Sequence, residues 1–312
     1  MNRRQTAAVA GDDVPFLLTP AEEKRIAKGL SPGIAWPTLV MAVALPAAHW
    51  TVVGLGLARV LPLWVCAAIL TFTAYAHYTL VHESIHGNLA PGVAKLRWIN
   101  DVVGWVGALG LSFNWPMMMR THALHHAHTN TEDDPDIIAK GSLGQLVVTW
   151  LIAHVALGLM PLFAMRYISP AKYRAVEKAL QPTEVLQASA VTILIDALLI
   201  AALSQGRGLD WLCLMFIPTR LAALILMIFF QWLPHYPFDR TERYLNTRIS
   251  LWAGGTVVLL QQNLHLMHHL WPSVPFYNYG HLYRRLRPIL IARGSRIEGL
   301  MVGRYAQDRS QG

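Results

Sequence analysis

The chain has 312 residues, of which 54% are hydrophobic and only 14% are charged. Soluble proteins contain about 25% charged residues, so this composition excludes an ordinary soluble protein and indicates an integral membrane protein. The formal charge is +8, but the basic residues lie beside apolar runs, which favours attraction to an anionic membrane leaflet over binding to nucleic acid.

Residues 1–30 are too polar for a cleaved secretory signal, so we expect them to form a polar N-terminal arm. A single membrane domain is predicted over residues 31–312. Within it, Trp36 to about Leu57 and Leu61 to about Leu80 each approach the ~20 residues that a transmembrane helix needs. Their short connection predicts a tight hairpin, so the second span ends on the same side of the membrane as the basic N-terminal arm. We expect this side to be cytoplasmic.

Two histidines directly follow the second span. His82 and His86 stand four residues apart, so on a helix both imidazoles point in one direction. With Glu83 they also match His-Glu-x-x-His, the pattern in which a zinc metalloprotease uses the glutamate as its general base. This pair alone therefore leaves a zinc protease open as an alternative.

The next apolar run, Asp101 to Met119, is short and is interrupted by glycines and Pro116. It is better suited to a re-entrant or interfacial helix than to a span. Behind it, His122, His125 and His126 stand at i, i+3 and i+4, which places the imidazoles of His125 and His126 each within about 60° of that of His122 on a helix. This spacing is typical of a metal-binding face.

The sequence after this second histidine group is acidic. Charged groups are costly in lipid, so the region is predicted to lie outside the hydrocarbon or within protein. His128 lies about 200° around the helix from His126, and we expect it outside the ligand face. Either His128 or a nearby carboxylate is predicted to orient the second ring nitrogen of a ligand. The candidate carboxylates are Asp133, Asp134 and Asp136.

Three apolar segments, residues 143–163, 185–203 and 211–233, separate the second histidine group from the third. All groups can share one site only if an even number of these segments cross the membrane. The short connection over residues 204–208 predicts that the last two form a second hairpin. Residues 143–163, which precede a basic stretch, are then predicted to lie along the membrane interface.

The third histidine group, His265, His268 and His269, repeats the spacing of the second. Eight histidines in three groups exceed what one mononuclear site uses, which predicts two metal ions. Iron is favoured over zinc, because a structural zinc site closes with four ligands that are often thiolates. Non-haem iron with open positions can instead activate dioxygen and cleave unactivated C–H bonds.

The full pattern resembles the membrane fatty acid desaturase-like superfamily, which includes acyl desaturases, carotenoid hydroxylases and carotenoid ketolases. The resemblance covers about residues 35–290, and its motifs are His82-x3-His86, His122-x2-His125-His126 and His265-x2-His268-His269. Thr129-Asn130 followed by Asp134-Pro135-Asp136 also resembles the sequence behind the second group in that superfamily.

The resemblance implies an all-α integral membrane fold with about four transmembrane helices in two hairpins, interfacial helices and a cytoplasmic histidine-lined cap that holds two irons. The implied reaction consumes dioxygen and two electrons from an external soluble donor, expected to be ferredoxin-like and served by its own reductase. We expect a bacterial inner membrane, with the site and both termini cytoplasmic. No catalytic residue beyond the metal ligands is expected, and these are His82, His86, His122, His125, His126, His265, His268, His269 and, after the last span, His235.

We predict the substrate class from the residues near the histidine groups. His265 stands where many acyl-lipid desaturases carry Gln, and the neighbourhoods of His235 and Trp271 look more like the carotenoid-modifying branch. We therefore expect hydroxylation of a carotenoid ring, as by a beta-carotene hydroxylase, with fatty acyl desaturation as the alternative. A zinc protease and a histidine-rich metal transporter are the other classes considered, and a transporter would need polar residues within its spans.

Overall fold

The computed structural model describes residues 18–156, 160–168 and 170–300. Within these residues the regular secondary structure is helical apart from one parallel two-stranded sheet, in which β1 (Arg248–Ser250) pairs with β2 (Arg296–Glu298). Residues 1–17 of the expected N-terminal arm and residues 301–312 of the C-terminal tail lie outside the described part of the chain.

Among the described residues, four helices are long and apolar enough to cross a membrane. α2 (Trp36–Leu57) pairs with α3 (Leu63–Ile85), and α9 (Pro182–Ser204) is followed by a continuous helix over residues 208–235. The expected all-α membrane fold with two helical hairpins is therefore confirmed. The continuous helix consists of α10 (Gly208–Trp211), the π-helical η5 (Leu212–Phe216), α11 (Ile217–Leu226), the π-helical η6 (Met227–Trp232) and α12 (Leu233–His235).

The helix α3 continues past Leu80, where its apolar run was expected to end, as far as Ile85. Residues 73–84 are buried except for the half-buried Tyr78. This end of α3 has left the outer surface and is surrounded by protein. The helix can therefore continue through polar residues, including His82, that lipid would not accommodate.

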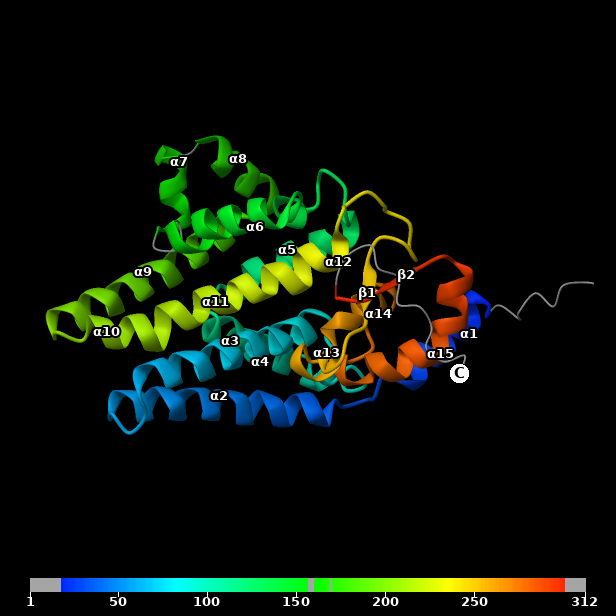
Figure 1. The fold of residues 1–312 in the computed structure, drawn as a ribbon, viewed down its shortest axis with the longest axis horizontal. Coiled ribbons are helices and arrows are strands. Elements are labelled where there is room, and N and C mark those ends of the chain that lie inside the picture. The colour runs from blue at the N-terminus through cyan, green and yellow to red at the C-terminus, as the bar shows by residue number, and fades with distance from the viewer. Residues whose placement is uncertain (1–17, 157–159, 169, 301–312) are drawn as a thin grey trace, which may run out of the picture.

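The two hairpin turns lie at the same end of the molecule (Figure 1), and one carboxylate joins them. Asp210, buried at the start of the last span, pairs with Arg59 at 2.5 Å and with Arg207 at 2.7 Å. Arg59 belongs to the first turn, and Arg207 also donates a hydrogen bond to the carbonyl of Leu57. Because charge-assisted hydrogen bonds are short and directional, Asp210 holds the ends of the two hairpins together.

Two shorter helices follow the first hairpin, α4 (Trp98–Gly110) and α5 (Trp115–His128), and they meet at an angle of 101°. The side chain of Asn114 caps α5 by accepting a hydrogen bond from the backbone N–H of Met117 at 2.9 Å. The sharp bend agrees with the expected re-entrant or interfacial segment, since each helix alone is shorter than a span.

The segment expected to lie along the interface forms α6 (Leu143–Trp150) and the π-helical η3 (Leu151–Ala156), which together are shorter than the four spans. Beyond them, η4 (Leu162–Ala164), α7 (Met165–Ile168) and α8 (Pro170–Ala179) lead to α9.

The end of the molecule opposite the hairpin turns is a cap (Figure 1). It contains the sheet and four helices, α1 (Pro20–Gly29), α13 (Gly255–Val258), α14 (His265–Leu270) and α15 (Tyr279–Ala292). The short turns along the chain are η1 (Ala94–Leu96), η2 (Pro135–Ala139), η7 (Gln262–Leu264) and η8 (Phe276–Asn278). The largest hydrophobic cluster of the described residues joins α1, α14 and α15 and includes Ala27, Leu266, Met267, Leu282 and Leu286.

The cap is attached to the last span through a buried ion pair. Arg248 in β1 is 2% exposed, and its guanidinium lies 2.5 Å from the carboxylate of Glu298 in β2. The same guanidinium donates to the carbonyl of Tyr236, directly after the last span. Since a buried charge must keep its partners, Arg248 fixes the sheet, and with it the following α14, against the end of that span.

Candidate metal centre

Nine histidines converge where α3, α5, α12 and α14 meet beneath the cap. Their ring nitrogens form two groups of four, and within each group the candidate ligand atoms all lie within 4.8 Å of one another. The first tetrad consists of His82, His86, His122 and His268. The second tetrad consists of His125, His235, His265 and His269.

The ninth histidine, His126, lies between the tetrads. Its Nε2 is 2.7 Å from Nε2 of His268 and 3.2 Å from Nε2 of His122, both in the first tetrad. Its ring also stacks on the ring of His269 in the second tetrad, with centroids 4.5 Å apart. His122, His125 and His126 on α5 therefore all face the centre, as their spacing predicted.

Within each tetrad the Nε2 atoms approach to about hydrogen-bonding distance. In the first, Nε2 of His82 is 3.1 Å from that of His268, and Nε2 of His86 is 3.0 Å from that of His122. In the second, the separations between Nε2 atoms are 3.3 Å for His125 and His269, 3.3 Å for His235 and His265, and 3.1 Å for His269 and His265. The same ring atom of every histidine thus points inward.

Burial keeps most of these imidazoles neutral. It lowers the pKa of His86 to about 4, the pKa of His265 to about 3 and, together with the positive charge that His86 would carry, the pKa of His126 to about 2. The pKa values of His122, His268 and His269 are also lowered by burial. Neutral imidazole is the form that binds metal ions.

The tautomer of His235 follows from its contact with Asn130. The side-chain amide N–H groups of Asn130 donate to the carbonyls of Arg240 and Asn246, both at 2.7 Å, so its Oδ1 is the atom that faces His235. Nδ1 of His235 lies 3.1 Å from that oxygen and must carry the proton. The Nε2 atom, which points into the second tetrad, therefore presents a lone pair.

A carboxylate determines which ring nitrogen of His125 carries the proton. Nδ1 of this histidine lies 2.9 Å from Oδ1 of the buried Asp134, which also accepts the backbone N–H groups of Asn130 and Asp136. Burial lowers the pKa of His125, but the negative charges of Asp136 and Asp134 outweigh that effect and raise it above its ordinary value. In the neutral ring the proton shared with Asp134 stays on Nδ1, so Nε2 offers the lone pair.

The donor set fits a metal ion. The lone pairs of His125 and His235 both face the second tetrad, and such lone pairs repel one another at these separations unless a cation lies between them. Both tetrads consist of imidazole nitrogens, which suit iron, zinc, copper and nickel. Asp134 accepts a hydrogen bond from the outward nitrogen of His125, which is the contact that one of the three candidate carboxylates was predicted to make with a ligand ring.

The structure brings together all nine histidines that the sequence singled out. His128 ends α5 half-buried and joins neither tetrad, which agrees with its predicted place outside the ligand face. Sequence reasoning did not assign a role to Asn130, although it lies in the noted Thr129-Asn130 motif. It also missed Tyr279, whose hydroxyl oxygen lies 3.3 Å from Nδ1 of His268.

Glu83 lies outside both tetrads. Its Oε1 accepts hydrogen bonds from the backbone N–H of Phe276 at 3.1 Å and from the side chain of Asn88 at 3.5 Å. A metalloprotease needs this glutamate beside the metal-bound water. The contacts of Glu83 are instead those of a residue that attaches the end of α3 to the cap.

Residues 58–298, more than half of the chain, match the family model described as Fatty acid desaturase. The chain belongs to this family, in agreement with the superfamily resemblance of its histidine motifs, and it is an oxidoreductase.

The chain is also similar to individual proteins of known name. It is 27% identical over 224 residues to a beta-carotene ketolase of Paracoccus sp. (strain PC1), covering 68% of this chain and 75% of the relative. A beta-carotene ketolase of Paracoccus sp. (strain N81106 / MBIC 01143) is 26% identical over 215 residues, 67% of this chain and 74% of the relative. An acyl-lipid (9+3)-(E)-desaturase of Dimorphotheca sinuata is 21% identical over 259 residues, 68% of this chain and 63% of the relative.

Four apolar helices and membership of this family together indicate an integral membrane enzyme that oxidises a lipid or a carotenoid. The two histidine tetrads fit a metal site in such an enzyme.

Proposed function

We propose that the protein is a di-iron, dioxygen-dependent oxygenase that hydroxylates a carbon of a carotenoid end ring. In this proposal the eight histidines of the two tetrads, together with His126, are the iron ligands. The all-nitrogen donor set, the family membership and the similarity to two beta-carotene ketolases support it.

The observation that carries the substrate assignment is the position of Phe230. Its ring centroid lies 6.4 Å from that of His82 in the first tetrad and 6.1 Å from that of His265 in the second. Among the described residues, it is the only non-histidine ring in contact with both tetrads. We therefore infer that the reacting C–H bond approaches the two tetrads beside Phe230.

Two tyrosines extend this aromatic wall along α3. Tyr78 and Tyr75 precede His82 by about one and two helical turns on the same face, and their ring centroids lie 4.8 Å and 6.2 Å from that of Phe230. Flat apolar rings pack well against a conjugated chain. The wall thus runs from the centre towards the bilayer, along the direction from which a carotenoid would arrive.

Insertion of one oxygen atom converts C–H to C–OH and reduces the second oxygen atom of dioxygen to water, which consumes two electrons and two protons. When bound, the two irons would supply the dioxygen activation and hydrogen abstraction that side chains alone cannot provide. Asp134 and Asn130 keep two ligand rings in place, and Phe230 with Tyr78 excludes water and positions the substrate ring. The electrons come from an external soluble carrier, expected to be ferredoxin-like.

We also propose how the protein is oriented in the membrane. The site and both termini face the cytoplasm, and the membrane is a bacterial inner membrane. The excess of basic residues on α1 and α15, at the same end as the histidines, supports this orientation through the preference of basic residues for the cytoplasmic side.

Fatty acyl desaturation is the second candidate, because the chain is also similar to an acyl-lipid desaturase. Both reactions begin with the same hydrogen abstraction, so the centre itself does not separate them. The products differ: hydroxylation adds one oxygen atom, whereas desaturation removes two hydrogen atoms from an acyl chain.

The test is expression in a carotene-accumulating host and, separately, in a host with a profiled lipid composition, followed by mass spectrometry of both extracts. We expect a carotenoid heavier by one oxygen per modified ring, unchanged acyl chains, and loss of the product in His125→Ala but not in His128→Ala, which alters a histidine of the same helix outside the centre. A ring ketone as the sole product would mean that one carbon is oxidised twice. An unsaturated acyl product with untouched carotenoids would refute the carotenoid assignment.

A further inference from the structure

The helix α15 connects the surface of the cap to the histidine centre. At its first residue, Tyr279 is fully buried, and its hydroxyl oxygen lies 3.3 Å from Nδ1 of His268. On the outer side of the same helix, Arg284 and Arg285 are exposed. One rigid element thus touches a candidate metal ligand at one point and presents cations to the outside about one turn further along.

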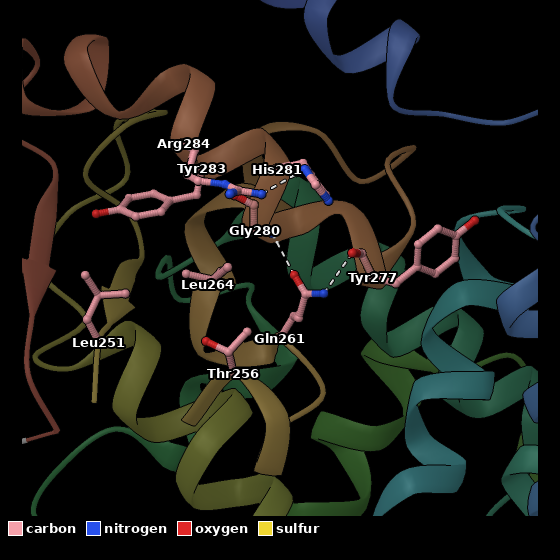
Figure 2. A pocket seen from close by; sticks show the side chains of 9 residues that line it. All are labelled: Leu251, Thr256, Gln261, Leu264, Tyr277, Gly280, His281, Tyr283 and Arg284. Atoms are coloured by element: carbon pink, nitrogen blue, oxygen red, sulfur yellow. Dashed lines mark hydrogen bonds between the residues drawn. The ribbon is translucent and has the colours of Figure 1, made fainter. Parts of the chain in front are cut away.

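A pocket of about 330 Å³ opens beside this helix. Figure 2 shows its lining side chains, which come from α15 and from the chain between β1 and α14: Leu251, Thr256, Gln261, Leu264, Tyr277, Gly280, His281, Tyr283 and Arg284. Arg284 stands at its edge and donates a hydrogen bond to Nδ1 of His281 at 2.9 Å. The pocket therefore combines an apolar wall with a cation at its rim.

Gln261 joins the wall of this pocket to the start of α15. Its Oε1 accepts the backbone N–H of Gly280 at 2.7 Å, and its side-chain N–H donates to the carbonyl of Tyr277 at 2.8 Å (Figure 2). Both bonded residues are within two positions of Tyr279. The wall of the pocket is thus hydrogen-bonded to the turn that carries Tyr279, and the Tyr279 hydroxyl contacts His268.

The helix that packs against α15 also presents basic residues to the outside. α1 packs beside α15 in the same hydrophobic cluster, and Figure 1 shows the two helices together at the cap end. Lys24 and Lys28, four residues apart on one side of α1, are exposed like the two arginines of α15. Of the two acidic residues in α1, Glu23 is buried and accepts a hydrogen bond from the Tyr244 hydroxyl.

We propose that this surface, defined by Lys24, Lys28, Arg284, Arg285 and the adjoining pocket, is the docking site of a small acidic one-electron carrier protein. The inference rests on the proposed function, since oxygen insertion requires two electrons that such a carrier delivers one at a time while being oxidised itself. Charge complementarity steers an acidic protein to a basic surface. An acidic side chain of the carrier pairs with Arg284, and the electron passes by way of the Tyr279 turn and His268 to the metal site that His268 would help to hold.

The first test measures binding, independently of turnover. The full-length protein is purified in nanodiscs of zwitterionic lipid and titrated with an acidic ferredoxin. Reversal of two charges in Arg284→Glu/Arg285→Glu should weaken the Kd about tenfold at low ionic strength. The difference from the native chain should shrink as salt shortens the Debye length from about 10 Å at 0.1 M to about 3 Å at 1 M.

Arg97→Glu is the matched control, because Arg97 is an exposed arginine outside α1 and α15. The Kd of this variant for ferredoxin should equal that of the native chain. Turnover with dithionite, which bypasses protein docking, should be equal in all three proteins. Unchanged ferredoxin binding in the double variant would overturn the docking site. Loss of binding to anionic vesicles with ferredoxin binding retained would identify the surface as a membrane contact and would also overturn it.

A second variant tests whether the electron passes by way of Tyr279. Tyr279→Phe removes the hydroxyl next to His268 and leaves the surface charges intact, so ferredoxin should bind normally while its reoxidation by the enzyme, followed by stopped-flow absorbance, becomes slower. Normal reoxidation would exclude the Tyr279 route. If ferredoxin binds in an Arg284-dependent manner but the native chain forms no oxygenated product with either reductant, the docking site stands and the proposed oxygenase function fails.

Discussion

Nδ1 of His125 lies 2.9 Å from Oδ1 of Asp134, and both residues are at least 98% buried. Asp134 is itself held by the backbone N–H groups of Asn130 and Asp136. The hydrogen bond thus fixes both the rotation of the imidazole and the ring nitrogen that stays free of a proton. In the proposed di-iron centre, this contact prepares His125 to bind a metal through Nε2.

Replacement of Asp134 by asparagine should preserve the shape of the site and remove the negative charge that keeps the proton on Nδ1. We expect Asp134→Asn to weaken metal binding by roughly 10- to 100-fold, the usual effect of removing such a partner. Competition with a chelator, with metal release followed optically, measures this affinity. Asp133→Asn is the control, since Asp133 is the exposed neighbour; equal metal affinity in the two variants would contradict an orienting role for Asp134.

The histidine spacing allowed most of the centre to be predicted, because i, i+3 and i+4 offsets fix a face wherever the chain is helical. His122, His125 and His126 on α5 are the clearest example. His86 differs in detail: it lies just beyond the last residue of α3 and still reaches the first tetrad. The prediction that both His82 and His86 reach the centre required only that they lie about one helical turn apart.

Features that depend on distant parts of the chain could not be predicted in the same way. His235 reaches the second tetrad through an irregular span with the π-helical segment η6 directly before it, and residue periodicity does not reveal a π-helix. Its orienting partner Asn130 is 105 residues away in sequence. The end of α3 was placed too early because the hydropathy of the sequence falls where the helix leaves lipid and enters the cap.

Phe230 should control where on the substrate oxidation takes place. Phe230→Leu keeps the site apolar but removes the ring that packs against His82 and His265, so the reacting carbon is less well placed. We expect unchanged metal content, a shift to additional oxidation positions, and product formation lower by up to about a hundredfold. Chromatography and NMR of the products measure the shift.

Phe229→Leu is the matched control for this substitution, because Phe229 is the half-buried neighbour in sequence and makes no ring contact with a histidine among the described residues. Its products should be those of the native chain. If Phe230→Leu also gives the native products at the native rate, then Phe230 does not line the path of the substrate.

The orientation can be measured with single cysteines and a membrane-impermeant maleimide, after Cys66 and Cys213 have been replaced by alanine. Gln205→Cys lies in the second hairpin turn and should be labelled from the outside of intact cells. Lys178→Cys, which follows the short interfacial segment, should be labelled only after the cells are opened. Outside labelling at position 178 would mean that residues 143–163 cross the membrane, and the four-span arrangement would fail.

The central claim is that the nine histidines hold two irons for a reaction with dioxygen. Element-resolved mass spectrometry of the purified active protein, combined with quantitative amino-acid analysis, tests it most directly. We predict about two irons per chain, with the iron content falling together with activity in His268→Ala. One zinc per chain, together with full activity in the absence of dioxygen, would contradict the account.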